Sequence, residues 1–203
     1  PQAPEAAGRR TLALVHSGAP APGMNMAVRA AVRVTRTWRS STIVQTYRLT
    51  TGSARLDIVT HLDWQERRVM LRARFPLALR APDSTADTIY GVHHRPTHAN
   101  TSWQAAHFEK SMQRWVDLSE SDYGVAILND GKYAYAATAS ELNINLLRSP
   151  IYPDHFADQG EHHFTYSVYP HHGGWADGGV VDEAIVLNSP LVAGPGERES
   201  RWG

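Results

Sequence analysis

Hydrophobic and polar residues alternate with a period of two along much of this chain. The clearest case is the stretch 56–62, where Leu56, Ile58 and Leu62 are separated by polar residues such as Asp57. Because successive side chains of a β-strand point to opposite faces, this pattern predicts a strand with one buried face. The same alternation predicts strands at three further stretches, which are 69–75, 142–146 and 164–168.

Weaker runs of β-branched and aromatic residues predict strands at 42–49, 124–128 and 132–136. The last two runs flank Asn129, Asp130 and Gly131, and an Asp-Gly step is typical of a tight hairpin. These two strands are therefore expected to pair with each other.

Helical periodicity is scarce, and it is confined to about 25–33 and 181–187. The long segment 91–121 lacks the strand pattern, and a connection of that length tends to be functional or to dock on a neighbour. The whole pattern predicts an all-β fold, a large antiparallel β-sandwich with few short helices.

Composition narrows the classes of function. The chain has 203 residues with 42% hydrophobic residues, and no apolar run approaches the roughly 20 residues that cross a bilayer. Lys+Arg and Asp+Glu both number 20, so the formal charge is zero and neither nucleic acid nor a membrane surface is an expected partner. Cysteine is absent, which excludes disulfides and thiolate chemistry. Residues 1–10 lack the apolar core of a secretory signal, so we expect a cytoplasmic location.

Eleven histidines raise the question of a metal site, and three adjacent pairs occur: His93-His94, His162-His163 and His171-His172. Adjacent residues on a strand point to opposite faces, so the two members of a pair cannot easily share one ion. No recognised metal-binding framework is present, and structural or surface roles are favoured.

The segment 93–103 combines groups suited to sugar recognition. Asn100, Thr101 and Ser102 can bond to hydroxyl groups, Arg95 can donate a bidentate pair, and Trp103 offers a flat apolar face. The alternative is that the polar groups form local turns while Trp103 anchors the segment in the core.

A second group of candidates comprises Asn129, Asp130 and Arg148. Arg148 follows a predicted strand and can reach toward a ligand, or it can pair with Asp154 or Asp158 as a loop clamp. Turn chemistry alone accounts for the Asp130-Gly131 step. The sequence contains no serine nucleophile elbow, phosphate-binding Walker loop or dinucleotide fingerprint, so no catalytic residue is assigned.

Several ordered stretches resemble the C-terminal β region of glycoside hydrolase family 38 α-mannosidases, over about 32–191. They are RLDIVTHLDWQERRVMLRARFPL at 55–77, RPTHANTSWQAAHFE at 95–109, RWVDLSESDYGVAILNDGKYAY at 114–135, LLRSPIYPD at 146–154 and HHFTYSVYPHHGGW at 162–175. The resemblance implies a large sandwich, similar to the galactose-mutarotase type, packed against an N-terminal barrel.

In that family the barrel carries the zinc and the aspartate nucleophile of a retaining α-mannoside hydrolase, and this sequence does not contain it. The resemblance therefore implies a noncatalytic chain that has no cofactor of its own, lines the substrate cleft and supports the missing barrel. It also implies that Arg148 approaches the sugar and that Asn100 to Trp103 line the same junction. Gln104 departs from the acidic residue common in the family. The sequence does not decide whether the chain forms a homo-oligomer.

The stretch 11–34 instead resembles the opening strand, glycine loop and helix of a phosphofructokinase, with Gly18, Gly23 and a helix-capping Asn25. The downstream motifs of that family are absent. We therefore divide the chain into a segment 1–31, a sandwich 32–192 and a flexible tail 193–203. Two alternative functions remain, which are a stand-alone carbohydrate-binding module and a fused remnant of a sugar-phosphate kinase.

Overall fold

Two antiparallel β-sheets form the body of the protein. The computed structural model describes residues 9–13 and 28–189, and within them the larger sheet has nine strands in the order β1-β2-β3-β4-β13-β10-β9-β6-β7. These strands are β1 (Arg9–Ala13), β2 (Val28–Trp38), β3 (Ser41–Thr50), β4 (Leu56–Trp64), β6 (Asp83–Thr88), β7 (Gly91–Pro96), β9 (Trp115–Ser119), β10 (Tyr123–Asn129) and β13 (Gly160–His172).

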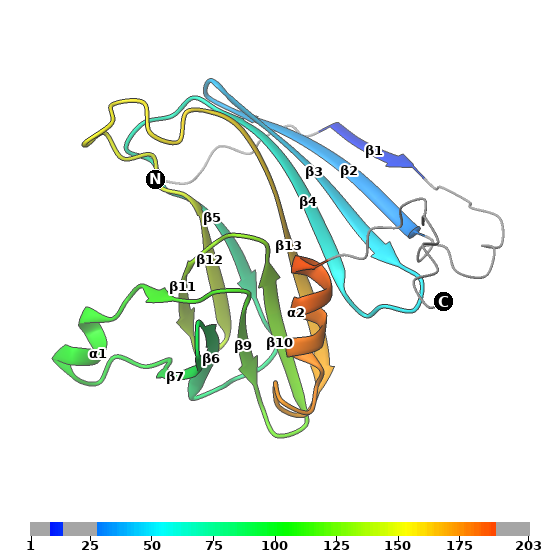
Figure 1. Ribbon diagram of the computed structural model, residues 1–203, viewed down its shortest axis with the longest axis vertical. Helices are drawn as coiled ribbons and strands as arrows, with labels where there is room; N and C mark the ends of the chain where they lie inside the picture. Colours follow the sequence, from blue (N-terminus) through cyan, green and yellow to red (C-terminus); the bar gives the residue numbers. More distant parts are fainter. Residues whose placement is uncertain (1–8, 14–27, 190–203) are drawn as a thin grey trace, which may run out of the picture.

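The smaller sheet has four strands and packs against one face of the larger. It consists of β5 (Leu71–Pro76), β12 (Glu141–Leu147), β11 (Ala134–Thr138) and β8 (Lys110–Ser111), in that order. Figure 1 shows β2, β3, β4 and β13 curving together as one arched layer, with β5 and β12 facing them. Ile58 and Leu62 of β4 meet Leu142 and Ile144 of β12 in the core between the sheets. The expected antiparallel β-sandwich is confirmed.

Strand β13 joins the two halves of the large sheet. Its residues 160–168 pair with β4, and its residues 166–172 pair with β10. Tyr166, Ser167 and Val168 therefore have strand partners on both sides. Because β4 and β10 lie far apart in sequence, this single strand holds together segments that no local turn connects.

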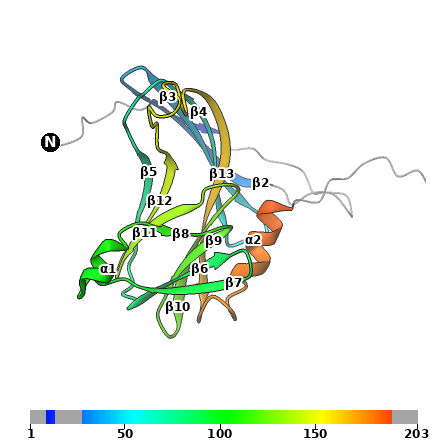
Figure 2. The ribbon, with the colours of Figure 1, turned by 60° about the vertical axis from the view of Figure 1, so that its left-hand side comes forward.

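Helix α2 (Val180–Asn188) covers part of the outer face of the large sheet, as Figure 2 shows from the side. Val180 and Ala184 pack on Trp115 of β9. A buried ionic cluster also attaches the helix: Arg55 donates to Asp57 (2.7 Å) and to the Glu183 side chain (3.0 Å). A buried charge is tolerated only when it is paired and hydrogen-bonded, and both conditions are met here. The helix predicted at 181–187 is confirmed.

The predicted strands at 56–62, 69–75, 142–146 and 164–168 lie within or overlap observed strands. The expected hairpin is wrong, because β10 pairs with β9 and β13 whereas β11 pairs with β8 and β12. The Asn129 side chain accepts the backbone N–H groups of Gly131 (3.0 Å) and Lys132 (2.6 Å). The turn chemistry is therefore as expected, but the turn carries the chain from one sheet to the other.

Two further expectations need correction. The segment 91–121 contains β7, β8, β9 and the short helix α1 (Ser102–Ala106). Its strands are short, and β7 carries polar residues on both faces, which hides the period of two.

The helix expected at 25–33 is also wrong for the residues that the structure describes, since residues 28–33 belong to strand β2. Gly18, Gly23 and Asn25 lie outside the described residues. No helix among the described residues is long and apolar enough to cross a membrane.

A buried histidine occupies space that two glycines provide. His171 lies on β13, and its Nε2 atom is 2.8 Å from Oδ1 of Asp117, with both side chains 1% exposed. A β-carbon on Gly178 would lie 2.3 Å from the His171 ring, and one on Gly124 would lie 2.4 Å from it. The hydrogen bond to Asp117 fixes the ring from the third side, so the ring cannot move away from an added β-carbon.

Gly178→Ala is therefore expected to lower the free energy of unfolding by about 1–3 kcal/mol, the usual cost of overpacking. Gly174→Ala is the matched control, because a β-carbon there meets nothing within 4 Å. It should change stability by less than about 0.5 kcal/mol. Urea unfolding curves measure both values, and equal stability of the two variants would contradict this account of the packing.

Candidate functional site

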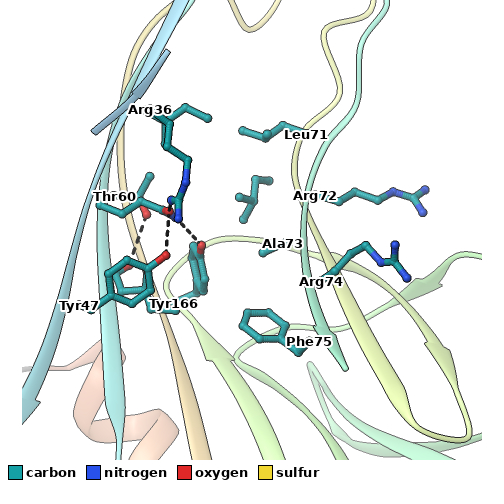
Figure 3. Close-up of a pocket in the computed structure, with 13 residues that line it drawn as sticks. Arg36, Tyr47, Thr60, Leu71, Arg72, Ala73, Arg74, Phe75 and Tyr166 are labelled. Atoms are coloured by element: carbon teal, nitrogen blue, oxygen red, sulfur yellow. Dashed lines mark hydrogen bonds between the residues drawn. The ribbon is translucent and has the colours of Figure 1, made fainter. Parts of the chain in front are cut away.

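A cavity of about 270 Å³ opens between the two sheets. Residues of β2, β3, β4 and β13 line one side, and residues of β5 line the other, as Figure 3 shows. Strand alternation explains the lining, since Leu71, Ala73 and Phe75 point inward while Arg72 and Arg74 point away from the cavity. Arg74 pairs instead with Glu141 (2.5 Å), and Arg72 with Glu109.

Gln45 organises the polar wall of the cavity. Its Nε2 atom donates to the Tyr166 hydroxyl (2.7 Å). Its Oε1 atom accepts from Nη1 of Arg36 (2.7 Å) and from the Tyr47 hydroxyl (3.1 Å). Buried polar groups must find such partners, and here one amide joins three side chains from three strands.

Burial raises the pKa of Tyr166 to about 12, and the neighbouring Tyr47 phenol adds to the increase. The Tyr166 hydroxyl is therefore protonated at neutral pH and acts as a hydrogen-bonding group rather than as a base. No carboxylate lines this cavity among the described residues. The wall can hold a neutral polar group, but it does not supply a paired acid and base.

Arg148, the first sequence-based candidate, is exposed at the end of β12. The clamp at this point uses its backbone: Oδ2 of Asp158 accepts the N–H groups of Arg148 (3.1 Å) and Ser149 (2.7 Å). The Asp158 carboxylate therefore fixes the loop without engaging the guanidinium group of Arg148 in an ion pair.

The candidates at 100–103 lie on or just before α1, and all four are exposed. Thr101 caps the helix by accepting the N–H of Gln104 (3.2 Å), while the Gln104 side chain accepts the N–H of Thr101 (3.1 Å). The suggested core anchor is wrong, because Trp103 is 80% exposed. Arg95 lies on β7, where its Nη2 atom is 3.3 Å from Nδ1 of His93.

Asn129 is fully buried, and both polar atoms of its side-chain amide are hydrogen-bonded. Its Nδ2 atom donates to the Gln113 carbonyl (2.9 Å), and its Oδ1 atom accepts the backbone N–H groups of Gly131 and Lys132. The neighbouring Asp130 carboxylate accepts the N–H of Thr165 (2.7 Å), and burial raises the pKa of Asp130. Both residues fix the connection between the sheets.

The sequence-based candidates therefore form separate groups. Figures 1 and 2 place α1 beside the β8 edge of the small sheet, away from the end of β12 that precedes Arg148. Sequence reasoning missed Gln45 and Arg36 as members of a polar wall. The available signal was Tyr166 on the predicted inner face of 164–168, because a buried tyrosine hydroxyl requires a partner.

Residues 19–156 match the glycosyl hydrolases family 38 C-terminal domain. The chain belongs to this family. It is 43% identical over 136 residues to alpha-mannosidase 2C1 of Mus musculus, covering 67% of this chain and 13% of that protein. It is also 43% identical over 138 residues to alpha-mannosidase G of Dictyostelium discoideum, covering 68% of this chain and 13% of that protein.

A solved structure shares the fold. An alpha-mannosidase from Enterococcus faecalis V583 superposes with a TM-score of 0.73 at 19% identity, over 89% of this chain and 24% of that chain. The chain thus spans only a small part of the length of the proteins it matches. The phosphofructokinase resemblance is not borne out, because the family match already begins at residue 19. The alternative of a sugar-phosphate kinase remnant has no support.

Tyr166→Phe tests the polar wall. Loss of the hydroxyl leaves the buried Nε2 of Gln45 without its partner, which is expected to cost about 1–3 kcal/mol at neutral pH. Tyr152→Phe is the control, because Tyr152 is 87% exposed. Chemical unfolding of both variants at pH 7 makes the comparison.

The pH dependence gives a second readout of the same variant. The raised pKa of Tyr166 contributes stability that is fully present below the unfolded value of about 10 and is lost as pH rises toward the folded value of about 12. The wild-type chain should therefore lose about 2–3 kcal/mol more than Tyr166→Phe across this window. If the free energy of unfolding changed equally with pH in the wild type and in Tyr166→Phe, the pKa of Tyr166 would not be raised by burial.

Proposed function

We propose that this chain is the noncatalytic β-sandwich part of an α-mannosidase, in which it lines the substrate cleft and supports a catalytic barrel. The observation that carries the proposal is the match of residues 19–156 to the family 38 C-terminal domain. The fold it shares with the Enterococcus faecalis alpha-mannosidase supports the same conclusion.

The chemistry of the cavity supports a noncatalytic role. Retaining glycosidases generally need two carboxyl groups about 5–5.5 Å apart beside the sugar. The cavity wall instead presents the side chains of Gln45 and Arg36 and the phenol groups of Tyr47 and Tyr166. Such groups can shape and stabilise a cleft, but bond cleavage requires acids from another part of the enzyme.

Exposed apolar and aromatic side chains supply a surface on which a second domain can pack. Tyr90 is 99% exposed, Ile89 is 69% exposed and Tyr133 is 65% exposed, and all three border one hollow beside β6 and β7. A contiguous apolar surface of this kind is typical of an interface. We assign it to contact with the barrel, and we place α1, with Asn100 to Trp103, at the margin of the same junction.

We assign Arg148 to hydrogen bonding with the sugar substrate. Its guanidinium group projects from a loop whose backbone Asp158 fixes, so a charged donor is presented by a rigid support. Arginine binds hydroxyl and carboxyl oxygens through several N–H groups at once. The substrate class is an α-mannoside, and the expected location is the cytoplasm.

The purified chain should not hydrolyse an aryl α-mannoside, with or without added zinc, and it should show no saturable micromolar binding of mannose oligosaccharides. Release of the aryl group and isothermal titration are the two measurements. Zinc-dependent turnover would contradict the noncatalytic role. Micromolar binding of the sugar by the isolated chain would instead favour a stand-alone carbohydrate-binding module.

In a mannosidase that carries this domain, Arg148→Ala is expected to raise the KM for an aryl α-mannoside. A hydrogen bond to a charged group contributes about 1.5–3 kcal/mol, which corresponds to roughly 10- to 150-fold. Arg80→Ala, another exposed arginine, is the control and should leave KM unchanged. Equal kinetics for both variants would remove Arg148 from the sugar contacts.

A further inference from the structure

Three side chains with metal-binding atoms lie together on the outer face of the large sheet. On β4, Ile58 and Leu62 point into the core, so His61 points to the opposite face. On β13, Phe164 and Tyr166 point inward, so Glu161 and His163 lie on that same outer face.

Strand register brings the three residues together. His163 is the direct cross-strand partner of His61, and Glu161 precedes it by two positions on the same strand. One nitrogen or oxygen atom from each of the three side chains lies within 4.8 Å of the others. The two imidazole rings stack with their centroids 4.1 Å apart.

An independent observation singles out His61. Its Nε2 atom is buried and has no hydrogen-bond partner among the residues that the structure describes. A buried polar atom without a partner is destabilising, and such atoms in folded proteins call for an explanation. A metal ion held between the rings and Glu161 would give this nitrogen the partner that the described residues do not supply.

We propose that His61, His163 and Glu161 form a binding site for a divalent transition metal, with zinc as the expected ion. Two imidazoles and one carboxylate are a known zinc ligand set, and the fourth tetrahedral position is left to water. Magnesium and calcium prefer oxygen ligands and do not match this set. The stacked rings must rotate about their Cβ–Cγ bonds for both lone pairs to meet one ion.

A second carboxylate lies next to the site. Asp63 is the cross-strand partner of Glu161, and its Oδ1 atom accepts a hydrogen bond from the Gln65 amide (2.5 Å). Such a group is placed to orient a metal-bound water from outside the ligand set. The ion would bridge β4 and β13 and so stabilise the strand pair that connects the halves of the large sheet.

The test is a titration of the full chain, freed of affinity tags and pretreated with a chelator, with zinc sulfate in an isothermal calorimeter. One ion per chain is expected to bind, together with a rise in Tm, because an ion that binds only the folded state stabilises it. Magnesium sulfate should give no heat of binding. This inference does not rest on the proposed function, since its readout is metal binding rather than activity.

Variants locate the ion. His163→Ala and Glu161→Gln should each weaken zinc binding at least about tenfold, given that loss of even an outer partner weakens metal binding by about 10- to 100-fold. His172→Ala is the matched control, because it removes an exposed histidine from the same strand outside the cluster. Glu161→Gln preserves the shape of an exposed side chain, so it remains informative if a histidine variant unfolds. Absence of zinc binding, or equal affinity in all variants, would overturn the proposal.

Discussion

The pairing of β13 with β4 on one side and β10 on the other is the constraint on which the structure depends. The hydroxyl of Ser167 donates to Asp57 across 110 positions of sequence, and the backbone ladders run alongside. Tyr166 closes the cavity, His171 fills the space beside α2, and His163 faces outward, all from this one strand. A long-range pairing therefore positions the core, the cavity wall and the outer-face cluster together.

Much of the fold could be predicted from the sequence, because strands with one buried face alternate visibly, as Leu142 and Ile144 do. Pairing partners could not be predicted in the same way. The Asp-Gly step at 130–131 correctly indicates a turn, but the local signal does not reveal that β10 and β11 enter different sheets. Strand β6 (DSTADT) escaped notice because small polar residues are buried there through hydrogen bonds such as that between Ser84 and Tyr135.

The residues of the candidate sites were harder to predict, because their neighbours in space are distant in the chain. A search of adjacent histidines considers His162 and His163, which face opposite ways, whereas His163 and His61 meet only through register. Gln45 and Tyr166 likewise meet across 121 positions. The family resemblance supplied what patterning could not, namely the proposal that this sandwich packs beside the catalytic barrel of an α-mannosidase.

Native-state hydrogen exchange measures the role of β13 directly. If this strand holds the large sheet together, its amides and those of β4 and β10 that pair with it should exchange with one common free energy, equal to that of global unfolding. If the amides of β2, β3 and β4 instead lose protection in a partial opening that leaves β10 protected, the two halves are separate cooperative units, and the central role given to β13 is wrong.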